Sequence, residues 1–285
     1  MMMKQTIPPK AKLVSHAKDS AKAQQEAVEA FEKELQQLYD QYFLRVARFI
    51  SKKDKSATDA INMNDATKVI NDLSKILSDS GYEDVIADYL DRFPAVTKQA
   101  LEYFEAFGVK PSLAGIDEEG LHALINFGRN ELTSHIESAL VGPVQSHLLQ
   151  AAVGNVDRSE LVNTILEMDP STRNANVLVD DIYAQYQRAV TVQKAQVLDM
   201  KIYQYLGPDD AITSEQCDAM LHINKHGVEG MLYEDEITVG LHKNLTRNPL
   251  IGGGHPRCRH QWSPVTEDYA VSLGFVPRQQ LQEAA

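Results

Sequence analysis

Residues 21–50 read AKAQQEAVEAFEKELQQLYDQYFLRVARFI, and this stretch decides the fold class. Its large apolar side chains recur in steps of three or four residues. They are Val28, Phe31, Leu35, Leu38, Tyr42, Val46 and Phe49. Because an α-helix has about 3.6 residues per turn, this spacing places them on one face of a long amphipathic helix. We expect that face to pack in the core of the chain, with a partner surface as the alternative.

Similar apolar periodicity continues along the chain and predicts further helices. The predicted helices lie at about 69–77, 82–92, 94–107, 117–140, 159–168 and 177–200. Glycine and proline mark their ends, among them Gly108, the Gly142-Pro143 pair and Pro170. Beyond Leu206, turn residues separate short apolar pieces, which favours small strands. The sequence therefore predicts a mostly α fold, with an N-terminal helical array and a small C-terminal α+β module.

Changes in composition and periodicity give the expected domain boundaries. They are a flexible arm at 1–20, a helical domain at 21–170, a lead-in helix at 171–200, a compact module at 201–277, and a frayed helix or tail at 278–285. The arm is expected to be flexible because it contains Pro8-Pro9 and lacks apolar periodicity.

The composition limits the classes of function. The 285 residues include 28 Lys+Arg against 40 Asp+Glu, a formal net charge of -12. Such a protein repels phosphates unless its cations gather locally, which argues against a general DNA-coating role. Two cysteines are too few for a disulfide-built secreted scaffold and are typical of a reducing cytosol. We find no signal peptide or membrane-spanning window, so no membrane association is expected.

The segment NPLIGGGHPRCRHQWSPV at 248–265 gathers glycines, prolines, histidines and the only tryptophan. With an upstream cysteine it supplies two thiols and two imidazoles. These are Cys217, His255, Cys258 and His260. Thiolate and imidazole are the ligands that tetrahedral zinc prefers. The favoured alternative is that both cysteines are small buried hydrophobes packed near Trp262, the more frequent fate of an intracellular cysteine.

Two other interpretations concern the cations of this region. Cys258 could be a nucleophile, because flanking arginines would lower its pKa and a neighbouring histidine could accept its proton. The sequence offers no orienting carboxylate for such a site, so we favour a non-enzymatic role. The basic residues are also candidate contacts for DNA or for an acidic protein surface. They are Lys243, Arg247, Arg257 and Arg259.

Two separated segments together resemble a known signature. TSEQC at 213–217 and HPRCR at 255–259 are similar to the D-x-R-T-S-x-x-C and P-L-H-P-x-C-R motifs of the phage minor head protein family, typified by the F protein of phage Mu. The matching residues are Asp210, Thr213, Ser214, Cys217, His255, Pro256, Cys258 and Arg259. Ile212 stands where the family has arginine.

The resemblance implies a non-enzymatic virion component that acts in head morphogenesis and in DNA packaging or ejection. Its implied partners are the portal protein, other capsid proteins, further copies of itself and the packaged DNA. Its implied place is the capsid interior near the portal, after assembly in the host cytoplasm. No cofactor is implied, and zinc stays an open alternative. The rival functions are a zinc-stabilised DNA-binding module and a Cys/His-dependent enzyme. We expect the matched segments, with Trp262, to close the module by packing Cys258 near Cys217.

Overall fold

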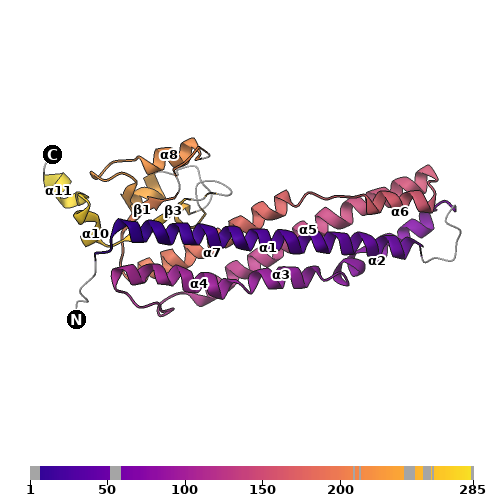
Figure 1. Cartoon of the computed structure of the whole chain (residues 1–285), viewed down its shortest axis with the longest axis horizontal. Coiled ribbons are helices and arrows are strands. Elements are labelled where there is room, and N and C mark those ends of the chain that lie inside the picture. Colours follow the sequence, from indigo (N-terminus) through magenta and orange to yellow (C-terminus); the bar gives the residue numbers. More distant parts are fainter. Residues whose placement is uncertain are drawn as a thin grey trace. The chain divides into compact units, whose positions relative to one another are not determined.

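The computed structural model describes residues 7–51, 59–207, 209–211, 213–240, 248–252, 258 and 260–283 (Figure 1). Of the residues that the structure describes, 71% are helical, and a small three-stranded antiparallel sheet lies in the C-terminal region. The predicted fold class, mostly α with a small C-terminal α+β part, is therefore confirmed.

Long helices dominate the chain as far as the first strand. They are α1 (Lys10–Ser51), α2 (Met63–Ser78), α3 (Tyr82–Leu90), α4 (Phe93–Glu102), the 3-10 turn η1 (Tyr103–Phe107), α5 (Glu118–Gly154), α6 (Arg158–Leu166) and α7 (Arg173–Val197). The elements that follow are short. They are β1 (Ile202–Leu206), α8 (Glu215–Leu221), β2 (Met231–Tyr233), η2 (Glu236–Gly240), α9 (Pro249–Gly252), β3 (Gln261–Val265), α10 (Glu267–Ser272) and α11 (Arg278–Glu283).

Contacts within the chain define two compact units that are discontinuous in sequence. The first unit comprises Met1–Glu26, Arg92–Ile125 and Asp180–Ala285, and the second comprises Ala27–Asp91 and Asn126–Val179. This division differs from the contiguous domains expected from the sequence. The reason is that α1, α5 and α7 each contribute residues to both units. Periodicity shows that a helix is long and amphipathic, but not which neighbours each part of it has.

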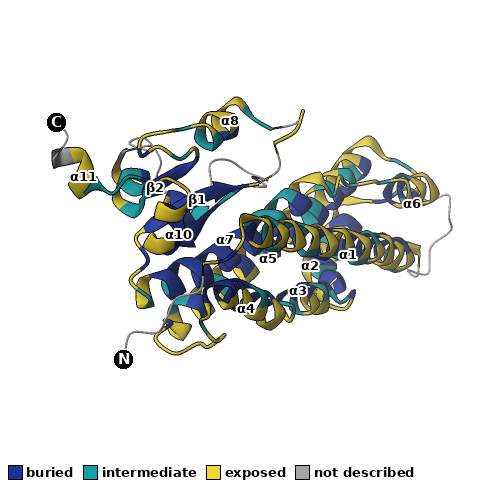
Figure 2. Ribbon diagram, turned by 60° about the vertical axis from the view of Figure 1, so that its left-hand side comes forward, coloured by how far each residue is buried: buried dark blue, intermediate teal, exposed yellow. Residues whose placement is uncertain are grey.

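The apolar face of α1 lies in the core of the second unit. All of its expected members are buried except Phe49, which is half-buried. Phe31 packs edge-on against Tyr89, with ring centroids 5.4 Å apart. The Tyr89 hydroxyl donates a hydrogen bond to the Val179 carbonyl at 2.7 Å. The buried and exposed faces of α1 can be followed in Figure 2. The prediction that this face packs within the chain is confirmed.

The predicted flexible arm at 1–20 is wrong from Lys10 onward, where α1 begins. Leu13 is only 1% exposed and belongs to the core of the first unit. A ring nitrogen of His16 hydrogen-bonds to the Gln99 carbonyl at 3.0 Å. This stretch is rich in lysine and has few large apolar residues. Its buried face therefore produced no recognisable apolar periodicity in the sequence.

The predicted break at Gly142-Pro143 is also wrong, because α5 continues through it. A proline ring normally restricts the residue before it, but Gly142 has no Cβ to clash with that ring. Leu140 and Val144 are fully buried on either side of the pair. Their packing outweighs the one backbone hydrogen bond that Pro143 cannot donate.

The small sheet organises the first unit. Its strand order is β2-β1-β3, and both pairings are antiparallel. In β1, Tyr203 lies opposite Pro264 and Tyr205 lies opposite Trp262. The Tyr103 hydroxyl of η1 donates a hydrogen bond to the Pro264 carbonyl at 2.8 Å. This bond ties an N-terminal helical turn to an edge of the C-terminal sheet.

The expected tail at 278–285 begins with a short helix, α11. The Arg278 guanidinium binds the Asp235 carboxylate through hydrogen bonds of 2.6 and 2.8 Å. It also lies over the Tyr233 ring, 4.2 Å from the ring centroid. The helix is the first of the two expected forms of this segment, and Arg278 attaches its start to the module.

One buried ion pair holds neighbouring helix ends together in the second unit. Arg158, 2% exposed, donates to the Ile50 carbonyl at 3.1 Å and to the Asp65 carboxylate at 3.0 Å. Ile50 lies in the last turn of α1, where carbonyls lack partners within the helix. Asp65 lies in the first turn of α2. Arg158 thus connects the end of one helix to the start of the next.

Arg158→Ala is expected to lower the free energy of unfolding by roughly 3 kcal/mol or more, because it deprives the buried Asp65 carboxylate of its cation. Chemical denaturation followed by circular dichroism measures this change. The control is Arg45→Ala, at an exposed position of the same unit, expected to change stability by less than about 0.5 kcal/mol. Similar effects of the two substitutions would contradict the role given to Arg158.

Candidate metal centre

The turn before α8 determines where Cys217 lies. The Thr213 hydroxyl accepts a hydrogen bond from the Asp210 amide at 3.0 Å and donates to the Asp210 carboxylate at 3.3 Å. Ser214 then caps α8 by accepting from the Cys217 amide at 3.2 Å. Cys217 therefore sits in the first turn of a capped helix, and it is 1% exposed. In this chain the residues of the first motif build a helix start.

The register of β3 against β1 places the other two residues of the cluster. Cys258 and His260 directly precede β3, and Trp262 within it pairs with Tyr205. The Tyr205 and Trp262 rings lie 4.7 Å apart between centroids. Arg188 of α7 fixes the same segment by donating to the Cys258 carbonyl at 2.9 Å and to the His260 carbonyl at 3.1 Å.

Two sulfur atoms and one imidazole meet in this buried region. Sγ of Cys217 lies 3.6 Å from Sγ of Cys258, the proximity that the sequence predicted for the two cysteines. A ring nitrogen of His260 lies within 4.8 Å of both sulfur atoms. The cysteines are free thiols. A tetrahedral zinc ion with Zn–S bonds of about 2.3 Å holds two sulfur atoms about 3.8 Å apart, so the observed spacing fits such an ion.

The His260 ring is positioned by close packing. It stacks on the Tyr205 ring, with centroids 5.4 Å apart and an interplanar angle of 10°. A methyl group at Gly207 would clash with the imidazole, so the absence of a side chain there makes room for it. Nε2 of His260 is buried without a hydrogen-bond partner among the described residues. An unpaired buried nitrogen costs about 1–3 kcal/mol, and a metal ion or a water molecule would satisfy it.

The surroundings favour one negative charge, on Cys258. Burial by itself would raise the pKa of this thiol. Contacts with the side chain and backbone of His260, and then the Arg188 charge, outweigh burial and lower the pKa of Cys258 to about 5. Burial raises the pKa of Cys217. The Tyr205 hydroxyl lies 3.3 Å from Sγ of Cys217 and 3.7 Å from Sγ of Cys258. Burial raises the pKa of Tyr205, so it remains a donor to sulfur.

The structure brings together three of the four predicted zinc ligands. Six residues of the predicted ligand, motif and contact sets lie outside the described residues. They are Lys243, Arg247, His255, Pro256, Arg257 and Arg259. Sequence reasoning missed Arg188, Tyr205 and Gly207. Of these, only Arg188 could have been recognised from the sequence. It is a cation four residues from both Ala184 and Val192, and this spacing places it on the buried face of α7.

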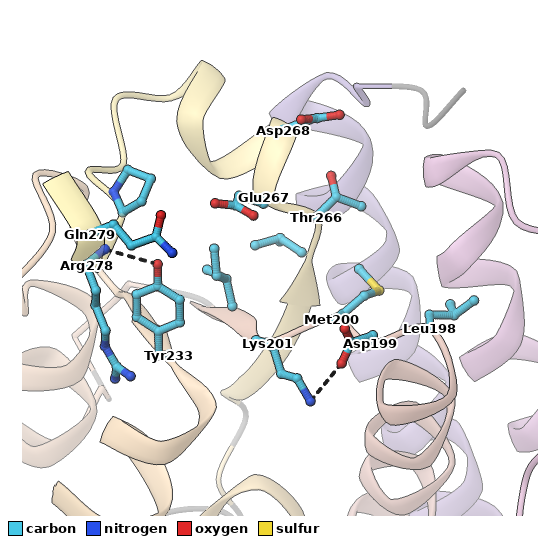
Figure 3. A pocket seen from close by; sticks show the side chains of 13 residues that line it. Leu198, Asp199, Met200, Lys201, Tyr233, Thr266, Glu267, Asp268, Arg278 and Gln279 are labelled. Atoms are coloured by element: carbon cyan, nitrogen blue, oxygen red, sulfur yellow. Dashed lines mark hydrogen bonds and ion pairs between the residues drawn. The ribbon is translucent and has the colours of Figure 1, made fainter. Parts of the chain in front are cut away.

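Two hollows of the first unit differ in size and in their distance from the cluster. A hollow of about 20 Å³ adjoins Cys258 and His260. A larger hollow, of about 650 Å³, is shown in Figure 3, and none of its 13 lining residues belongs to the cluster. The two cations that line it already have carboxylate partners. Lys201 contacts Asp199 at 2.9 Å, and Arg278 binds Asp235, which does not line the hollow. The cluster is therefore the better candidate for a functional centre.

No protein-family model, curated protein or solved structure matches this chain. Among the helices that the structure describes, none has the length and apolar character needed to cross a membrane. The functional argument therefore depends on the residues of the cluster and on the geometry around them.

Gly207→Ala is expected to displace the His260 imidazole while leaving both sulfur atoms in place. Co²⁺ is a suitable probe, because its absorption bands report thiolate and imidazole ligands. We expect Co²⁺ affinity to fall roughly tenfold or more, as for other substitutions that misalign a ligand. The control is Gly154→Ala, where the added Cβ makes only an ordinary contact of 3.5 Å with Val156. Equal Co²⁺ affinity in the two variants would contradict the assignment of His260 as a ligand.

Proposed function

We propose that this chain is a structural, non-enzymatic protein of phage head assembly whose C-terminal part is closed by one zinc ion. Cys217, Cys258 and His260 would hold that ion. The observation that carries the metal assignment is the meeting of two buried thiols with an imidazole in one cluster. Zinc bound there would cross-link α8 to the segment before β3, and its binding free energy would add to the stability of the fold.

The chemistry of the donors favours zinc over other common ions. Thiolate and imidazole are soft and borderline ligands, whereas magnesium and calcium prefer oxygen. The surrounding groups also suit such a site, because Tyr205 can donate to sulfur and Arg188 holds the ligand-bearing backbone. The fourth ligand would be a water molecule or His255, which the sequence analysis offered.

The burial of the cluster supports a structural role over catalysis. Cys258 is 3% exposed. The adjoining hollow of about 20 Å³ has room for little more than one water molecule. A catalytic nucleophile needs its substrate within bonding reach, and this hollow is too small for an organic substrate.

The resemblance to phage minor head proteins supports the assembly role. Asp210, Thr213 and Ser214 form the turn and cap that deliver Cys217 to the cluster. A motif that positions a buried residue in this way stabilises the fold. Such a structural motif is expected in an assembly protein. The proposed partners are the portal protein, other capsid proteins and further copies of the chain, inside the capsid near the portal. Contact with packaged DNA would fall to the basic residues near the C-terminus.

Native mass spectrometry of the chain, alone and co-expressed with the portal protein of the same genome, tests both parts of the proposal. We expect one zinc ion per chain and a complex of defined stoichiometry with the portal. Cys217→Ser and Cys258→Ser are expected to lose the zinc, because each removes one of three described ligands. The control is His222→Ala, which changes an exposed histidine outside the cluster.

The metal assignment and the assembly role can be contradicted independently of each other. Chains without zinc after purification in zinc-containing medium would contradict the metal assignment and leave the assembly role standing. Zinc-loaded chains that bind no portal at low or physiological salt would contradict the assembly role and leave the metal assignment standing.

A further inference from the structure

The small hollow beside Cys258 has a polar lining. Ser20 and Gln24 line it from α1, and Gln187 and Arg188 line it from α7. The Gln187 side chain donates a hydrogen bond to the Ser20 hydroxyl. The volume of about 20 Å³ suits one molecule of the size of water or hydrogen peroxide. A purely structural metal site does not require such a hollow beside one of its ligand residues.

The second feature is the distance between the sulfur atoms. At 3.6 Å, Sγ of Cys217 is in contact with Sγ of Cys258, but the two atoms are not bonded. A disulfide bond is about 2.05 Å long, so closing it requires a relative movement of about 1.6 Å.

We propose that Cys258 and Cys217 form a peroxide-responsive dithiol, in which a small peroxide entering the hollow converts the two thiols into a disulfide. The release of metal on oxidation rests on the proposed zinc site. The formation of the disulfide does not, because it requires only the two cysteines and the hollow.

The reaction balances in two steps. Sulfur of Cys258 attacks one peroxide oxygen. An S–O bond forms, the O–O bond breaks, and the leaving hydroxide takes up the proton that the Cys258 thiol loses, so that it becomes water. The Cys217 sulfur then attacks the Cys258 sulfenic acid. The S–S bond forms, the S–O bond breaks, and the Cys217 proton leaves with the hydroxyl as a second water. Two thiols are oxidised and one peroxide is reduced.

Arg188 is well placed to assist the first step. Arg188 lines the hollow, and its guanidinium donates to the carbonyls of Cys258 and His260. A fixed cation next to the sulfur atom stabilises the thiolate that attacks and the hydroxide that leaves. When both thiols become a disulfide, a bound ion would lose two anionic ligands and would be released.

The size of the hollow determines which oxidants can react. Hydrogen peroxide fits, whereas cumene hydroperoxide and oxidised glutathione are too large to reach the sulfur atom without opening the fold. Ala21 also lines the hollow, and Ala23, two residues further along α1, has similar exposure but does not line it. Ala21→Leu and Ala23→Leu are therefore a matched pair of variants.

The test treats the full chain with hydrogen peroxide, with cumene hydroperoxide or with oxidised glutathione, each with and without prior metal removal. Intact mass reports the loss of two hydrogen atoms, and a chromophoric chelator reports released zinc. We expect hydrogen peroxide to form the Cys217–Cys258 disulfide and the larger oxidants to react much more slowly. Ala21→Leu should slow oxidation roughly tenfold relative to Ala23→Leu, because access controls thiol oxidation.

Cys217→Ser keeps the proposal testable if the disulfide is short-lived. In this variant Cys258 has no thiol to react with, and its sulfenic acid should accumulate as the gain of one oxygen atom in intact mass. The proposal is overturned if the thiols resist hydrogen peroxide, if the larger oxidants react as fast, or if Ala21→Leu and Ala23→Leu behave alike. A metal-free chain that still forms the disulfide would separate this proposal from the zinc assignment.

Discussion

The pairing of β1 with β3 is the constraint on which the candidate metal centre depends. It sets Tyr205 opposite Trp262 and so carries Cys258 and His260 to the place where α8 presents Cys217. Without that register, the three residues would have no reason to meet, because 41 positions separate the two cysteines. The buried cluster therefore joins α8, which carries Cys217, to the segment before β3, which carries Cys258.

A buried cation accounts for the electrostatics around this cluster. Arg188 lies in the core and donates to the backbone carbonyls of Cys258 and His260, and its charge acts on the Cys258 thiol. The lowered pKa of Cys258 follows in part from this arrangement. The same thiolate suits a zinc ion and also an attack on peroxide. A structural role and a redox response can therefore reside in one set of residues.

Sequence reasoning succeeded where one physical signal dominated. The apolar spacing of α1 predicted a buried face, and the paired motifs predicted that Cys258 lies near Cys217. It failed where several weak effects had to be compared. Pro143 stays within α5 because packing outweighs one hydrogen bond, and Leu13 is buried although lysines surround it. Tyr205 and Gly207 could not be recognised, because their roles follow from the strand register and from the shape of a neighbouring ring.

X-ray absorption at the zinc edge on the purified chain tests the central claim most directly. The account predicts a zinc edge with a first coordination shell of two sulfur atoms at about 2.3 Å and nitrogen or oxygen at about 2.0 Å. Cys258→Ser should abolish the edge, because it removes one of the three described ligands. A chain without zinc, or a shell of oxygen and nitrogen alone, would contradict the account.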